Sequence, residues 1–180
     1  MTRYIYAFNI EEIEGEIFFR IPRFPEIISN MTIDDFKKTS GSSVRKHISD
    51  ALVTALQARI AERLAIPEGD NPNLLKADGF CVLSVRQAVK IVFYLVYREN
   101  CKSVSELARR LGKHETAVRR MLDLRHPSVT SEIEKALDLF GKRLVHNWSI
   151  EPTMPTDLPI GFSAPTEDKL AYSFGAGVSL

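Results

Sequence analysis

The stretch SVSELARRLGKHETAVRRMLDL, from Ser103 to Leu124, decides how the C-terminal half of this chain folds. Its apolar residues recur at helical spacing, and Gly112 divides the pattern into two parts. The apolar positions are Leu107, Ala108, Leu111, Val118, Met121 and Leu122. The spacing predicts two short helices hinged at Gly112. Such a pair is either a DNA-reading helix-turn-helix or a plain helical hairpin.

A DNA-reading pair needs a small residue at the turn, an apolar inner face, and polar or basic groups outside its second helix. All three are present here. If the second helix starts near His114, its first residues enter the major groove deepest, and Arg119 can grip a guanine. The candidate DNA-binding residues are Ser103, Arg110, Lys113, His114, Glu115, Thr116, Ala117, Arg119 and Arg120.

These candidates differ in their expected roles. Arg110, Lys113 and Arg120 are better suited to phosphate contacts, which set affinity without carrying sequence information. Ser103, followed three residues later by Glu106, predicts a capping box at the start of the first helix. Glu115 is an acid at the reading end, so it either accepts from a cytosine amino group or sits off the DNA.

The N-terminal residues alternate in the period of a strand through Tyr4, Tyr6, Phe8 and Ile10. EIFFRI repeats that period after a turn near Gly15, so the two segments predict a β-hairpin. EIISNM predicts a short third strand, and DDFKKTSGSS predicts a loop. A helix is expected from about Val44 to Leu64, followed by a linker, PEGDNPN, and a fourth strand in DGFCVLSV.

The segment 86–99 is apolar nearly all round, and we interpret it as the helix that completes the helix-turn-helix core. Apolar residues on every side favour a homodimer, or a higher even oligomer. A last helix is expected over 129–140, closed by Gly141. The fold class is therefore α+β, with a β-β-β-α-β domain over 1–85, an all-α helix-turn-helix domain over 86–148, and an irregular Pro/Gly-rich tail over 149–180.

Charge is distributed unevenly along the chain. Residues 1–35 carry seven acidic and three basic side chains, whereas residues 102–126 carry seven basic and three acidic ones. One end is thus suited to a basic partner and the other to a polyanion. Without a signal peptide or an apolar run long enough to span a bilayer, we expect a cytoplasmic protein with no membrane association.

The histidines and cysteines show no metal-ligand spacing, and no nucleophile has a matching base. We therefore expect no catalytic residues, metal or cofactor, and no enzymatic activity. The glutamates between Glu11 and Glu16 cluster at the predicted turn, and they are better interpreted as solvated than as a two-metal nuclease site.

The chain resembles the HicB antitoxins of bacterial toxin–antitoxin pairs. YIYAFNI, EIFFRIPRFPEI and DALVTAL carry the resemblance in the first domain. VKIVFYLVYRENCKSVSELARRLGKHETAVRRMLDLRHPSVTSEIEKALDLFGKRL carries it in the second. The resemblance spans roughly residues 1–146. It implies a partial RNase H-like domain and a dimeric helix-turn-helix domain.

In that family the first domain neutralises a small HicA messenger-RNA-cleaving toxin, and the second represses the antitoxin's own operon by binding operator DNA. The resemblance therefore implies a basic HicA-like toxin and operator DNA as partners, while the toxin-contact residues stay unassigned. The alternative is a stand-alone transcriptional regulator whose first domain senses a ligand or dimerises.

Overall fold

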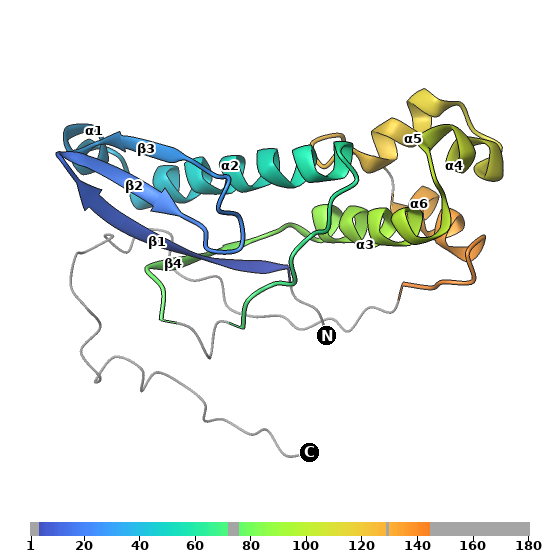
Figure 1. Ribbon diagram of the computed structural model, residues 1–180, viewed down its shortest axis with the longest axis horizontal. Coiled ribbons are helices and arrows are strands. Elements are labelled where there is room, and N and C mark those ends of the chain that lie inside the picture. The colour runs from blue at the N-terminus through green and yellow to red at the C-terminus, as the bar shows by residue number, and fades with distance from the viewer. Residues whose placement is uncertain (1–3, 72–75, 129, 145–180) are drawn as a thin grey trace, which may run out of the picture.

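The computed structural model of the chain describes residues 4–71, 76–128 and 130–144. In these ranges the protein is an α+β fold with a four-stranded antiparallel sheet and six helices (Figure 1). The strands are β1 (Ile5–Ile13), β2 (Glu16–Arg20), β3 (Ser29–Thr32) and β4 (Gly79–Val82), in the spatial order β3-β2-β1-β4. The predicted α+β class and four strands are confirmed.

The β1–β2 hairpin turns through Glu14 and Gly15, whose φ angles are +50° and +85°. Glycine adopts such left-handed values without a steric penalty. Ile10 pairs with Phe19 across the two strands. The third strand begins at Ser29, three residues later than the predicted EIISNM, because the chain is still turning where the Ile27 N–H donates to the Phe24 carbonyl (3.0 Å).

The predicted loop at DDFKKTSGSS is wrong, since it holds helix α1 (Ile33–Lys38) and the first turn of α2 (Gly41–Ala61). Local capping explains the helix. The Thr32 hydroxyl accepts from the Asp35 N–H at 3.1 Å, and Ser40 caps α2 in the same way. Acidic residues in the first turn of α1 and lysines in its last also complement the helix dipole.

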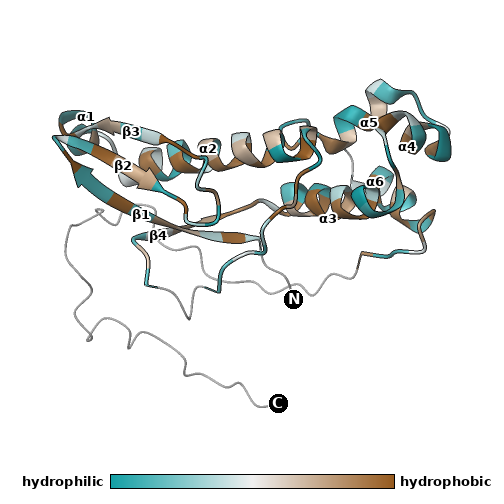
Figure 2. Ribbon diagram, in the orientation of Figure 1, coloured by the Kyte–Doolittle hydropathy of each residue, from teal (hydrophilic) through white to brown (hydrophobic). Residues whose placement is uncertain are grey.

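Helix α2 covers one face of the sheet and continues beyond it toward the C-terminal helices (Figure 1). Its buried side chains pack with the inward residues of the strands, and Figure 2 shows brown, hydrophobic stretches on the facing sides of these elements. The buried residues of α2 are Val44, Ile48, Leu52, Val53, Ala55, Leu56 and Ile60. One continuous apolar core therefore joins the sheet to the helical end.

The C-terminal helices are α3 (Val85–Asn100), α4 (Val104–Leu111), α5 (Glu115–Leu122) and α6 (Thr130–Asp138), as predicted. Helix α3 buries seven residues against its neighbours in the same chain. For example, the Tyr94 hydroxyl donates to the Leu64 carbonyl at 2.5 Å. Intrachain packing thus accounts for this burial, and the dimer inferred from it stays a prediction.

The proposed division at residue 85 falls at the start of α3, and it also stays a prediction. The tail over 149–180 lies outside the described residues. Within the described ranges, none of the helices combines the length and the apolar character that crossing a membrane requires.

Candidate nucleic-acid interface

The turn between α4 and α5 is built on Gly112, whose φ is +61°. Its N–H donates to the Arg109 carbonyl at 3.2 Å, and the Lys113 N–H donates to the Ala108 carbonyl at 2.9 Å. These bonds satisfy carbonyls that the end of α4 leaves unpaired. The predicted hinge between two short helices is confirmed.

The start of α4 is capped, but not by the full capping box that the sequence predicted. The Ser103 hydroxyl accepts from the Glu106 N–H at 3.1 Å. The Glu106 carboxylate, however, accepts from the Lys102 N–H at 2.7 Å rather than from that of Ser103, whose backbone is extended at φ −150°. This bond, together with Arg110 at 2.7 Å, holds the pKa of Glu106 below its usual range.

The inner face of the pair packs as predicted. Leu107 and Ala108 of α4 are buried, and so are Val118, Met121 and Leu122 of α5. Since these residues face the core, the opposite sides of both helices are left to solvent. The predicted DNA-binding residues lie on that side: all are exposed except Ala117, which is half-buried.

Glu115 is the first residue of α5, and its carboxylate is held within the protein. It accepts from the Ser105 hydroxyl of α4 and lies 3.5 Å from the Arg119 guanidinium. A carboxylate at this position also complements the positive end of the α5 dipole. The geometry therefore gives Glu115 a role in holding α5 against α4.

The basic side chains around the turn differ in how they are engaged. Lys113 pairs with Glu132 of α6, and Arg110 pairs with Glu106 one turn earlier. The Arg119 side chain stays 67% exposed despite its contact with Glu115. Among the described residues, the Arg120 guanidinium makes no hydrogen bond or ion pair. Arg119 and Arg120, the two cations of α5, are thus more available to an external anion than Arg110 and Lys113.

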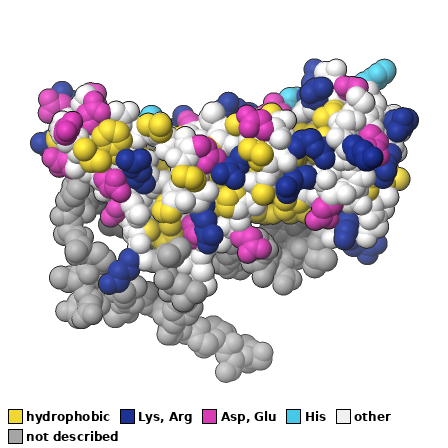
Figure 3. All heavy atoms as spheres, viewed as in Figure 1, with side chains coloured by type: hydrophobic (Ala, Val, Ile, Leu, Met, Phe, Trp, Pro, Cys, Tyr) yellow, Lys and Arg dark blue, Asp and Glu magenta, His cyan; other side chains and the backbone are white. Residues whose placement is uncertain are grey.

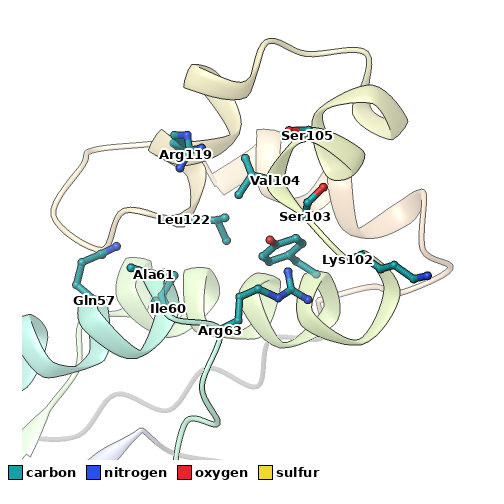
Figure 4. A pocket seen from close by; sticks show the side chains of 11 residues that line it. Gln57, Ile60, Ala61, Arg63, Lys102, Ser103, Val104, Ser105, Arg119 and Leu122 are labelled. Carbon is teal, nitrogen blue, oxygen red and sulfur yellow. The ribbon is translucent and has the colours of Figure 1, made fainter.

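A groove of about 410 Å³ runs between the end of α2, the start of α4 and the side of α5 (Figure 4). Arg63, Lys102 and Arg119 line it, and its lining contains no carboxylate. Arg63 stacks over the Tyr97 ring at 4.6 Å and donates to the Cys101 carbonyl at 2.7 Å. The groove extends the positive surface from α5 to the end of α2.

The end of α5 is also fastened to α2. The Arg125 guanidinium donates to the Thr54 hydroxyl at 2.7 Å, and the Leu124 N–H donates to the Gln57 side chain at 2.9 Å. Sequence reasoning missed these contacts, because the partners are about 70 positions apart and no periodicity connects them. They fix the helical pair relative to the sheet-bearing part of the chain.

The balance of charged side chains differs between the two ends of the molecule. Acidic side chains gather near the β1–β2 turn, and basic ones gather around α4 and α5 (Figure 3). Glu11, Glu12 and Glu14 are exposed at the acidic end. No group of three or more histidine, cysteine or acidic side chains in the described ranges is arranged to hold a metal ion.

The fold and this surface define an α+β protein with a sheet that is acidic at one end and a helical pair whose outer face is basic. Comparison with known proteins then shows what the chain is similar to. No protein-family model matches the chain. It is 29% identical over 140 residues to Antitoxin HicB of Pseudomonas fluorescens, a match that covers 78% of this chain and 90% of that protein.

It is also 28% identical over 121 residues to Antitoxin HicB 2 of Photorhabdus laumondii, covering 67% of this chain and 81% of that protein. The chain is thus similar to two proteins named as HicB antitoxins, and the resemblance predicted from its sequence is confirmed.

Proposed function

We propose that this chain is the antitoxin of a toxin–antitoxin pair, acting in the cytoplasm. In this proposal its N-terminal part, with a partial RNase H-like fold, neutralises a small HicA-like messenger-RNA-cleaving toxin, and its α4–α5 pair represses its own operon as a helix-turn-helix. The observation that carries the proposal is the similarity to two proteins named as HicB antitoxins. The separation of charge between the two ends supports it.

The DNA-binding part of the proposal rests on the outer face of α5. His114, Thr116 and Arg119 are exposed there, and the His114 side chain makes no capping hydrogen bond. The N-terminal residues of a recognition helix meet base edges, and an arginine further along it can bind a guanine, so these three are the proposed reading residues. Arg120 is proposed to contact phosphate, as are Arg110 and Lys113 if they leave their glutamate partners.

Glu115 is proposed to lie off the bases. Its carboxylate already accepts from Ser105 and faces Arg119, so accepting from a cytosine amino group would require it to leave both. In this arrangement the acid contributes to the reading surface only indirectly, by orienting Arg119. Substituting Glu115 should therefore change base preference less than substituting Arg119 does.

Titration of duplex DNA from upstream of the chain's own coding sequence tests this interface. Arg119→Ala should lose preference at one base position, worth about 1–3 kcal/mol if the contact is bidentate. Arg120→Ala should weaken binding to all sequences alike and reduce the salt slope by about one. Lys135→Ala, an exposed change on α6, is the matched control for charge. Equal losses on every duplex from both arginine variants would contradict these roles.

The proposed dimer gives a separate expectation for the DNA. A two-fold dimer should protect two half-sites about 34 Å apart, or a multiple of that distance. Footprinting on the upstream duplex, together with light scattering of the free protein, measures both properties. A single unpaired footprint would argue against the dimer without contradicting DNA binding.

We propose that the toxin is a basic protein that binds the acidic end of the sheet by charge complementarity. In this proposal the chain neutralises the toxin by binding it and has no enzymatic activity of its own. A protein that binds RNA is usually basic, and the acidic side chains near the β1–β2 turn would attract it.

Co-expression with the product of a small basic open reading frame next to the gene tests this part. We expect rescue of growth and a complex that copurifies. If neither is seen while the upstream DNA is still bound, the chain is better described as a stand-alone helix-turn-helix regulator. That outcome would remove the antitoxin proposal and keep the DNA-binding one.

A further inference from the structure

Lys90 is a lysine of α3 whose side chain is fully buried, with 0% of the residue exposed. Its ammonium group donates to three backbone carbonyls at the end of α5 and in the turn that follows. The acceptors are Arg120 at 3.2 Å, His126 at 2.7 Å, and Asp123. An ammonium has three donors, so all of them are used.

The position of these carbonyls explains why a charge is tolerated inside the core. The last carbonyls of a helix have no partner within the helix and form the negative end of its dipole. Burial lowers the pKa of Lys90, and the nearby Asp123 opposes that effect. A buried charge is stable only when it is fully hydrogen-bonded, and the three carbonyls supply those bonds.

The contact also fixes geometry. Helix α5 ends at Leu122 without a left-handed glycine, since Asp123 has φ −81°. The three carbonyls already accept from backbone N–H groups of the following turn, those of Asp123, His126 and Ser128, and Lys90 adds to each of them a charged donor from another helix. The Ser128 hydroxyl also donates to the Arg120 carbonyl at 2.9 Å. An apolar side chain could fill the same space, but it would remove the three hydrogen bonds through which α3 holds the end of α5.

We infer that Lys90 is a positioning residue for α5, which sets the orientation of this helix on α3 and thereby the preference for one DNA sequence over another. The inference rests on the proposed DNA-binding function. Base contacts depend on placing side chains against particular groove atoms, whereas phosphate contacts tolerate shifts of the helix. Loss of Lys90 should therefore reduce sequence preference more than overall attraction to DNA.

A merely structural role makes a different prediction. If Lys90 only stabilised the fold, a variant would contain a smaller folded fraction, and its affinities for all DNA would fall in the same proportion. The ratio between affinity for the upstream duplex and affinity for a scrambled duplex separates the two roles, because the folded fraction cancels from it.

Fluorescence anisotropy with the full chain measures this ratio for the wild type, Lys90→Met and Lys135→Met. The last variant removes an exposed lysine charge from α6. We expect Lys90→Met to lose about ten- to a hundredfold in affinity for the upstream duplex, the range for misplaced base contacts. Its affinity for the scrambled duplex and both affinities of Lys135→Met should stay within about twofold of wild type.

An unchanged ratio in Lys90→Met, with or without a parallel loss on both duplexes, overturns the inference and leaves the proposed function standing. If Lys90→Met does not fold, Lys90→Gln replaces it, because the amide is uncharged and its two donors can bond to at most two of the three carbonyls. A reduced ratio in that variant supports the positioning role, and a wild-type ratio overturns it. If the wild-type chain itself prefers neither duplex, the DNA-binding proposal and this inference both fail.

Discussion

Replacing Asp70 with alanine should destabilise the whole fold, although the residue lies in a segment without helix or strand. Asp70 is 6% exposed, and its N–H donates to the Ile5 carbonyl at 2.7 Å. Its carboxylate accepts from the Ala7 N–H at 2.9 Å and from Arg23 at 2.7 Å. Strand β2 pairs with β1 only from Asn9 onward. Asp70 therefore supplies the hydrogen-bond partners of the Ile5 carbonyl and the Ala7 N–H, which β2 does not reach.

The size of the effect follows from what the alanine would leave behind. Ala7 is 5% exposed, and water cannot readily take the place of the lost carboxylate. An unsatisfied buried donor costs about 1–3 kcal/mol. The Arg23 side chain is 50% exposed and can be solvated, so its loss adds little. We expect about 2 kcal/mol in total, or a fall in Tm of about 4–8 °C.

Urea unfolding followed by circular dichroism measures this free energy, with Arg23→Ala as the matched control. The control removes the exposed partner and keeps the bond between Asp70 and Ala7, so its loss should be clearly smaller. Asp70→Asn should fall between the two, because the amide oxygen can still accept. A change below about 0.5 kcal/mol in Asp70→Ala, or an equal loss in Arg23→Ala, would refute the reasoning.

Two further perturbations address the sheet and its contact with α2. A Cβ at Gly79 would lie 2.4 Å from the Phe8 ring across the β1–β4 ladder, so Gly79→Ala should cost about 1–3 kcal/mol in urea unfolding. Adding Phe8→Leu should recover part of that loss, and strict additivity would contradict a steric cause. The hydrogen bonds from Arg59 hold the pKa of Glu26 below its usual range, so this stabilisation is present above about pH 4.3 and declines as the pH falls. Glu26→Gln should flatten the dependence of stability on pH between about 5 and 3, and an unchanged slope would show that the pair contributes nothing.

The helical pair was the part of the fold most readable from the sequence. Its signals are local: an apolar stripe at helical spacing, a serine at the cap and a glycine at the turn. Each acts over three or four residues, and the structure has all of them, with Gly112 at φ +61°. Strand alternation around Phe8 was readable for the same reason.

The predictions that failed involved choices among several local hydrogen bonds. The polar stretch after Thr32 was predicted as a loop, but its threonine and serine caps start two helices. Glu106 was predicted to close a capping box, whereas its carboxylate selects the Lys102 N–H. Polar residues can satisfy either a turn or a helix end, and the sequence does not rank these outcomes.

The sequence by itself determined where most of the helices and strands of this protein lie, α1 and the first turn of α2 excepted, and which face of each is apolar. Those properties depend on neighbours a few residues away. The tertiary structure alone decided the partners of Lys90, Asp70 and Glu115. Each is a charged residue whose side chain could have been solvated, and each is satisfied by a group on another element. Such pairings depend on how the elements pack, since only packing brings a distant carbonyl, amide or hydroxyl within hydrogen-bonding distance of a charge.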